Sequence, residues 1–354
     1  MTLNDLEKKR KKYRNRIFLS MIIFAIILCY IPPKATVYED FIVFLIFSII
    51  IGFIIALLLT LGPKKKYSKA YKEYIVLRGL KEIFTDLNYE PESGMPRSTI
   101  ADTHMMYMGD IYKSNDFISG KYKDVAFSQA DVHIQEERET TDSDGNTTTY
   151  YVTIFRGRWM VFDFNKEFKA NVQVAQKGFG NNRVKERGLF SKKDDKSYYQ
   201  NVKMESESFN KRFNVYAQSE HEAFYILTPS LMEKIERLDD NNKGKLLLCF
   251  INNRLHIGLY DNKDSFEAPN CLFKINEEKE LNRTNGDIKV ITQFVDELNL
   301  DNTLFKKLSI NGEQTNEAQQ ENNTINQNPI NNQQQVVNEQ TISNQINMNN
   351  QNNI

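Results

Sequence analysis

Two uncharged apolar runs near the N-terminus constrain this chain more than any other feature of its sequence. They cover residues 17–31 and 41–61, and a short polar stretch separates them. The second run has 21 residues, and as a helix it would be about 31 Å long, enough to cross the hydrocarbon core of a bilayer. The first has 15 residues, about 22 Å as a helix, so crossing would need local thinning of the bilayer and snorkelling of Arg14 and Arg16. We expect a hairpin of two transmembrane helices.

Two alternatives to this hairpin stay open on the sequence alone. The first run has the length of the apolar region of a signal peptide and follows basic residues, but no small-x-small cleavage site comes after it. A helical hairpin buried in a water-soluble core would need a partner that covers evenly apolar helices on all sides. The second apolar run begins within ten residues of the first, and this favours two membrane spans over both alternatives.

Basic residues flank the two runs on their outer sides. Residues 1–16 carry a net charge of +5, residues 32–40 carry −1, and residues 62–75 carry +4. Because Lys and Arg beside transmembrane helices stay on the cytoplasmic side, both termini are predicted to be cytoplasmic. The basic residues expected at the surface of the lipid bilayer are Lys8, Lys9, Arg10, Lys11, Lys12, Arg14, Arg16, Lys64, Lys65, Lys66, Lys69 and Lys72.

Composition argues against several other classes of protein. The chain has 46 basic and 46 acidic residues, and zero net charge argues against a nucleic-acid-binding protein. Its three cysteines form no CxxC pair and its four histidines are far apart in the sequence, so we expect neither a disulfide scaffold nor a metal site. The glycines of residues 177–183 lack the third glycine of a phosphate loop. We expect no cofactor.

The sequence after the second run predicts a mostly antiparallel α+β domain. Residues 62–90 place apolar residues at helical spacing, which indicates an amphipathic linker helix. Alternating apolar residues in 125–135 and 150–165 predict a long hairpin, with a β-bulge near residues 128–130 where the alternation changes parity. Further elements are expected as strands at 171–174 and 209–227, a helix from Pro229, a hairpin at 245–260 and a helix at 288–300.

The predicted organisation therefore has five parts. These are a basic cytosolic N-terminus (1–16), a transmembrane hairpin (17–61), the linker helix (62–90), a β-rich cytosolic domain with a few helices (91–310) and a tail (311–354). Of the 44 tail residues, 25 are Asn or Gln. Such a composition cannot bury enough apolar surface to offset the ordering of the chain, so the tail is predicted to be disordered.

Three segments of the domain resemble a known family. Residues 155–174, 209–235 and 246–260 are similar to the bacterial family catalogued as domain of unknown function 3137, and the resemblance covers about residues 60–300. It implies a protein of the bacterial cell membrane with an N-terminal two-helix anchor and a cytosolic domain. It carries no established activity and no catalytic residues. The resemblance also suggests another membrane or cytosolic protein as partner, for which a LemA-type membrane protein is the candidate.

The densest group of polar residues among the strand signals is the candidate ligand site. Its members are Arg156, Arg158, Trp159, Asp163, Asn165, Lys166 and Glu167. Cross-strand ion pairs followed by a turn would explain the same residues. Because no motif has catalytic spacing, we expect a membrane-anchored interaction or sensory module rather than an enzyme. The alternative is a membrane-bound hydrolase or transferase that acts at this group; the sequence leaves catalytic residues and oligomeric state open.

Overall fold

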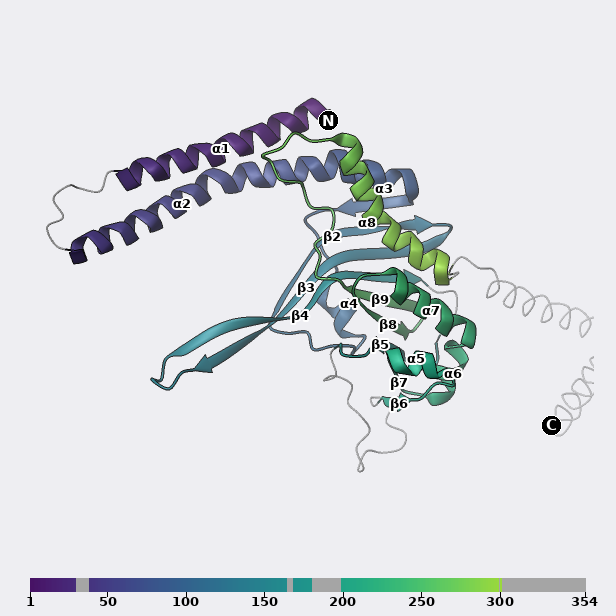
Figure 1. The fold of residues 1–354 in the computed structure, drawn as a ribbon. Helices are drawn as coiled ribbons and strands as arrows, with labels where there is room; N and C mark the ends of the chain where they lie inside the picture. The colour runs from purple at the N-terminus through teal and green to yellow at the C-terminus, as the bar shows by residue number, and fades with distance from the viewer. Residues whose placement is uncertain (30–37, 164–167, 180–198, 299, 301–354) are drawn as a thin grey trace, which may run out of the picture. The chain divides into compact units, whose positions relative to one another are not determined.

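The computed structural model describes residues 1–29, 38–163, 168–179, 199–298 and 300 (Figure 1). Three predicted site residues, Asn165, Lys166 and Glu167, lie outside these residues, and so does the predicted tail.

Helices form the first part of the chain. They are α1 (Leu3–Cys29), α2 (Tyr38–Tyr71), the π-helix η1 (Lys72–Val76) and α3 (Leu77–Ile83). Among the described residues, one continuous helical stretch, Leu45–Ile83, is long and apolar enough to cross a membrane. α1 has a basic first half, and its described apolar part ends at Cys29. By length and composition, one of the two N-terminal helices is therefore a candidate membrane span.

α1 and α2 lie side by side (Figure 1). Small residues occupy the contact between them, because Ser20 and Ser48 are both buried. Gly52 of α2 lies against the Phe24 ring of α1, and a Cβ at this position would collide with that ring. The absence of a side chain at Gly52 thus lets the two helices approach closely.

Within the described residues, nine strands form one sheet in the order β1-β2-β3-β4-β9-β8-β5-β7-β6. Every neighbouring pair is antiparallel. The strands are β1 (Thr85–Glu90), β2 (Ile111–Tyr122), β3 (Val125–Thr141), β4 (Thr147–Asp163), β5 (Val172–Gln176), β6 (Gln200–Val202), β7 (Phe213–Ala217), β8 (Lys245–Ile251) and β9 (Arg254–Tyr260). The remaining helices are α4 (Arg97–Ala101), α5 (Glu207–Arg212), α6 (Glu220–Ile226), α7 (Pro229–Asn241) and α8 (Glu277–Leu298). The predicted α+β class with an antiparallel sheet is confirmed.

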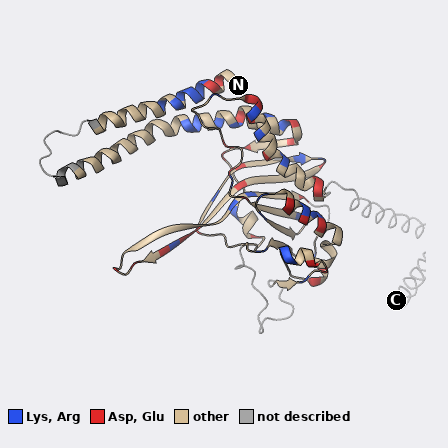
Figure 2. Cartoon of the chain, viewed as in Figure 1, with Lys and Arg blue, Asp and Glu red and all other residues tan. Residues whose placement is uncertain are grey.

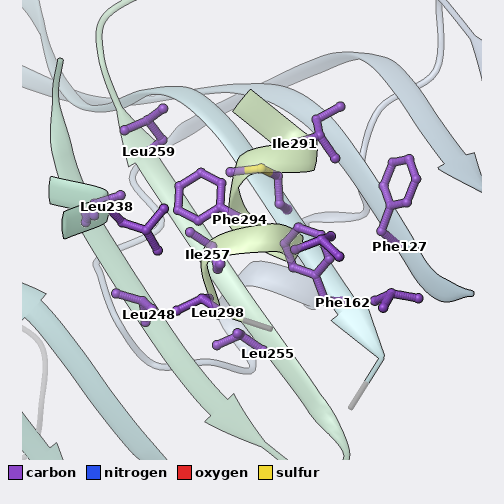
Figure 3. Close-up of a cluster of buried hydrophobic side chains, with 14 of the residues drawn as sticks. Phe127, Phe162, Leu238, Leu248, Leu255, Ile257, Leu259, Ile291, Phe294 and Leu298 are labelled. Atoms are coloured by element: carbon purple, nitrogen blue, oxygen red, sulfur yellow. The ribbon is translucent and has the colours of Figure 1, made fainter. Parts of the chain in front are cut away.

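Each face of the sheet has its own apolar cluster. On one face α8 packs its Ile291, Phe294 and Leu298 against strand residues such as Phe162 and Ile257 (Figure 3). η1, α3 and α7 add to the same cluster. The other face holds Phe155 and Trp159 under α4 and the chain around it. Full burial of large apolar side chains contributes roughly 1.5–3 kcal/mol each, so the two clusters supply the main stabilisation of the domain.

The change of parity in the apolar alternation of β3 has a different cause from the one expected. Residues 127–134 pair with β4 without a register shift. The irregularity expected near 128–130 lies in the neighbouring strand instead, because the pairing of β2 with β3 shifts between Asn115 and Ile118, opposite residues 129–131. Val125 and Phe127 belong to the α8 face, whereas Val132 and Ile134 belong to the Trp159 face. The parity changes because the positions that continue the α8 face, 129 and 131, hold buried polar side chains instead of apolar ones.

Two predicted elements differ in the structure. The linker helix ends at Ile83, and residues 85–90 form strand β1, because these residues pair with β2. The stretch 209–227 contains only one short strand, β7, between two helices. Ser206 and Ser219 accept hydrogen bonds from backbone N–H groups in the first turns of α5 and α6, and this capping favours helices over continuous strand. The capped helix from Pro229 and the hairpin at 245–260 are confirmed.

β3 and β4 continue past the sheet as a two-stranded ribbon (Figure 1). We call residues 136–152 the ribbon. β2 pairs with β3 only as far as Gln135, and β9 pairs with β4 only as far as Gly157. All side chains from Glu137 to Tyr151 are exposed. The ribbon therefore presents two free strand edges to its surroundings.

Candidate functional site

A buried ion pair joins the helices that follow α2 to the sheet. Lys72, the first residue of η1, is buried, and its Nζ lies 2.6 Å from Oδ2 of Asp116 in β2. The same ammonium is 3.0 Å from Oε1 of Glu267, in the loop before α8. One side chain therefore holds three parts of the fold together. We call this group, with the side chains that contact Asp116, the junction cluster.

Asp116 is placed inside the protein by an irregularity in β2. The register of β2 on β3 shifts between Asn115 and Ile118, and Asp116 has φ +54°, a conformation that Asp tolerates better than most residues. Its carboxylate is completely buried and accepts hydrogen bonds from Tyr89 Oη at 2.5 Å and Asn115 Nδ2 at 2.8 Å. Together with Lys72, these donors satisfy both carboxylate oxygens.

Burial and charge shift the ionisation of the pair. Burial acts to lower the pKa of the Lys72 ammonium, but the charges of Asp116 and Glu267 outweigh it and leave that pKa above its ordinary value. Burial raises the pKa of Asp116 despite the opposing effect of Lys72. Burial and the Asp116 carboxylate also raise the pKa of the Tyr89 phenol. Tyr89 therefore stays protonated and donates to Asp116.

A second buried carboxylate lies beside the junction cluster, on the strand next to β2. Asp131 of β3 pairs in register with Asn115 of β2 and with Arg158 of β4. Its Oδ2 accepts the backbone N–H of Ser265, whereas Oδ1 has no protein hydrogen-bond partner. Burial raises the pKa of Asp131 well above its usual range, although the Arg158 guanidinium opposes this shift.

Arg158 connects this second carboxylate to α8. Its Nη1 donates to the backbone carbonyl of Asp287 at 2.7 Å, and Nη2 lies 3.4 Å from Oδ1 of the same residue. The side chain is 2% exposed. Arg158 is thus a structural cation between the sheet and α8, not a group open to solvent.

Three carboxylates of this region are close enough to hold a cation. Oxygens of Asp116, Asp264 and Glu267 lie within 4.8 Å of one another. The Lys72 ammonium already contacts two of the three. A protein cation therefore supplies the charge that a metal ion would bring.

The described members of the predicted ligand site do not converge. Arg158 belongs to the α8 side of β4, whereas its neighbour Trp159 is fully buried in the cluster on the other face. Trp159 Nε1 donates to His256 Nδ1 at 3.4 Å, and burial lowers the pKa of His256 to about 4, which keeps that ring neutral. Arg156 is half-buried. Asp163 is exposed at the strand end, 3.3 Å from Arg254.

Among these residues, only Asp163 lines a described cavity, a small one of about 280 Å³. Because consecutive strand residues face opposite sides of a sheet, Arg158 and Trp159 cannot act on one ligand. A hydrolase or transferase site at this group therefore has no geometric support among the described residues.

Two of the residues predicted at the membrane surface are buried instead. Lys72 lies in the junction cluster, and Arg10 of α1 pairs with Glu7 at 2.8 Å and donates to the Cys271 carbonyl at 2.6 Å. Glu7 in turn accepts the backbone N–H of Ile275 at 2.8 Å. The prediction for these two residues is wrong because each finds a partner distant in sequence. The other ten are at least partly exposed.

Comparison with known proteins finds one family model that matches the chain from within β4 to the end of α8. Residues 153–300 match the family model described as "Protein of unknown function (DUF3137)". This match confirms the predicted resemblance to the family over this part of the chain. The DUF3137 region runs from β4 to the end of α8, so it contains Arg158, Glu267 and Asp287, whereas Lys72, Asp116 and Asp131 precede it. The junction cluster thus joins the DUF3137 region to the part of the chain before it.

Two further comparisons add no functional information. None of the curated proteins compared with the chain matches it. Among solved structures, a likeness is found to the crystal structure of the mycobacterial trehalose monomycolate transport factor A, TtfA, with 11% sequence identity and a TM-score of 0.35. The match covers 66% of this chain and 94% of that one. A likeness of this strength supports no conclusion about the chain.

Loss of the buried cation should destabilise the protein strongly. Lys72→Met should lower the free energy of unfolding by about 3–5 kcal/mol, because Asp116 would stay buried without its counter-charge. Chemical unfolding of the detergent-solubilised full chain measures this. The matched control is Lys69→Met, which removes an exposed ammonium 3.9 Å from Glu73 and should cost no more than about 0.5 kcal/mol. Adding Asp116→Asn to Lys72→Met should recover part of the loss. Equal losses of stability in Lys72→Met and Lys69→Met would contradict the assignment of Lys72 as a buried structural cation.

The burial of Asp131 should make stability depend on pH. Because the pKa of Asp131 is raised in the folded state, the folded protein binds this proton more tightly than the unfolded chain does. The resulting gain in stability is present below about pH 3.8 and is lost as pH rises through the raised pKa. Asp131→Asn cannot ionise and should be more stable than the wild type near neutral pH, with the difference vanishing near about pH 4. Unfolding midpoints across this range test it, with Asp144→Asn on the ribbon as control. Destabilisation by Asp131→Asn at every pH would show that pairing with Arg158 dominates instead.

Proposed function

We propose that the chain is a membrane-anchored module that binds another protein through its cytosolic sheet domain. The anchor is the pair α1 and α2. Large apolar side chains are exposed along both helices, among them Ile22 and Ile26 of α1 and Phe47, Phe53 and Leu58 of α2. Water-soluble proteins rarely expose continuous apolar surfaces of this size. A lipid bilayer is the surrounding that fits them.

The contact between the two helices supports two spans rather than one. Transmembrane helices associate through small residues that let backbones approach, and Ser20, Ser48 and Gly52 occupy this contact. The outward faces are apolar on both helices. α1 would cross the bilayer with its apolar half, aided by the flanking arginines.

The charge distribution supports one orientation. Basic residues gather at the same end of both helices, in the first half of α1 and the last part of α2 (Figure 2). Residues 1–16 and 62–75 carry net charges of +5 and +4. By the positive-inside rule this end is cytoplasmic, so we propose a bacterial cell membrane protein with both termini in the cytoplasm.

The ribbon is the observation that carries the interaction part of the proposal. A two-stranded hairpin alone is marginally stable in water, and free strand edges readily pair with another chain. Residues 136–152 hold five carboxylates and one guanidinium, a net charge of −4. A partner with a basic surface fits this charge. A LemA-type membrane protein is the candidate to test first.

Cysteine labelling in intact cells tests the topology. In a chain without Cys29, Cys249 and Cys271, a cysteine at Thr36 should react with a membrane-impermeant maleimide from outside. A cysteine at Asp144, on the exposed ribbon, should react only after the membrane is permeabilised. Labelling of both positions from outside, or of neither, would contradict the two-span arrangement.

Shortening the ribbon should abolish partner binding without unfolding the domain. Replacing residues 138–150 by Asn-Gly joins Glu137 and Tyr151, which pair across the ribbon, through a favoured two-residue turn. Purification from gently solubilised membranes should recover a defined partner with the wild type and at least about tenfold less with the shortened chain. A variant that changes only the tip, Gly145→Asn, serves as control. Equal recovery of the partner by the shortened chain would overturn the assignment to the ribbon.

A further inference from the structure

A cavity of about 740 Å³ lies between α2 and the turn that follows β1. One wall is the last part of α2, from Leu61 through Lys64, Lys65 and Ser68, and continues into η1. The opposite wall is the chain from Tyr89 to Ser93. Its volume is in the range of small-ligand sites, roughly 300–1,000 Å³.

Opposite charges are separated across this cavity. The α2 wall carries Lys64, Lys65 and Lys69, and the turn carries Glu90 and Glu92. A third glutamate, Glu73, also lines the cavity, one helical turn after Lys69. Its carboxylate lies 3.9 Å from the Lys69 ammonium. The ion pair of Lys65 with Glu92, at 3.2 Å, links the two walls, and both side chains are largely exposed. An ion pair this exposed contributes little and is easily exchanged for a ligand.

One end of the cavity lies next to the apolar part of α2. Leu61 is the last residue of the apolar run and lines the cavity. Lys64 and Lys65 follow it within about 6 Å along a helix axis, which matches the thickness of a lipid headgroup layer, about 5–8 Å on each side of the bilayer. The lysines and Glu92 are therefore at the level of the cytoplasmic headgroups when α2 spans the membrane.

We infer that the cavity binds the headgroup of a phospholipid that carries a phosphate and a primary amine, as phosphatidylethanolamine does. This inference rests on the proposed membrane anchoring. The lysines of α2 bind the phosphate through charge-assisted hydrogen bonds, and Glu90 and Glu92 accept hydrogen bonds from the ammonium. A quaternary ammonium has no N–H to donate, and a purely anionic headgroup meets the two glutamates without a counter-charge. The charge pattern therefore selects the primary amine.

The floor of the cavity connects this site to the junction cluster. Lys72 and Tyr89 line the cavity, and both contact Asp116. A bound headgroup therefore lies against two side chains that hold the helices to the sheet.

Lipid binding by the purified full chain tests the inference. Flotation with phosphatidylcholine vesicles is the first measurement, because failure to float would refute the membrane anchoring itself. Native mass spectrometry in detergent then compares phosphatidylethanolamine, phosphatidylcholine and phosphatidylglycerol. We expect the first to bind at least about fivefold more tightly than the other two.

Variants separate the two walls of the site. Glu90→Gln with Glu92→Gln should remove the preference for the primary amine, and Lys64→Gln with Lys65→Gln should weaken the binding of all three lipids. Lys66→Gln, at an exposed lysine that does not line the cavity, is the control and should change nothing. Equal binding of the three lipids by a chain that floats, or a preference that survives the glutamate changes, would overturn the inference while leaving the membrane anchoring intact.

Discussion

The contact of Lys72 with Asp116 determines how the N-terminal helices meet the sheet. Removing an ammonium and a carboxylate from water costs several kcal/mol per ion, and only close contacts with well-placed donors offset that cost. Asp116 has such donors in Lys72, Tyr89 and Asn115. Sliding η1 by one residue would move the ammonium both along the helix axis and around it, and the pair would separate. The main effect of the ion pair is therefore to specify how the helix docks, and its net contribution to stability is secondary. The arrangement of α3 and α8 follows from this docking.

Two irregularities of the backbone meet at this contact. η1 is a π-helix in an otherwise α-helical segment, and β2 shifts its register at Asp116, where the backbone adopts a positive φ. π-Helical turns and bulges reorient single side chains and are frequent at functional sites. Here one occurs on each side of the same ion pair. Regular geometry in either element would present a different side chain, so the two deviations and the buried pair depend on one another.

Much of the fold follows from periodicity that is visible in the sequence, and the junction cluster does not. The hairpin of β8 and β9 and the capped α7 are local, since their turns, caps and alternation lie within a few residues. Lys72 resembles Lys64 and Lys65 in sequence, and its burial depends on Asp116 and Glu267, which only the folded sheet brings near. One signal was present: the change of parity in residues 125–134 marks the buried polar positions Gln129 and Asp131. Such a change of parity indicates a bulge in the strand itself, because a strand rarely buries two polar residues on its core face, whereas the irregularity lies in β2.

Attachment at two points distinguishes this protein from a domain tethered by a flexible linker. α2 continues without interruption through Pro63 into η1, and the start of α1 is held separately by Arg10 and Glu7 against the loop before α8. A flexible linker would leave the domain free to rotate relative to the helices. Both helices are held by contacts with the sheet domain. A ligand can therefore affect the domain only by favouring one arrangement of these contacts over another. Because Lys72 and Tyr89 both line the cavity and contact Asp116, a lipid headgroup bound there would be coupled to the docking of the helices on the sheet by the free energy with which it favours one state of the junction cluster.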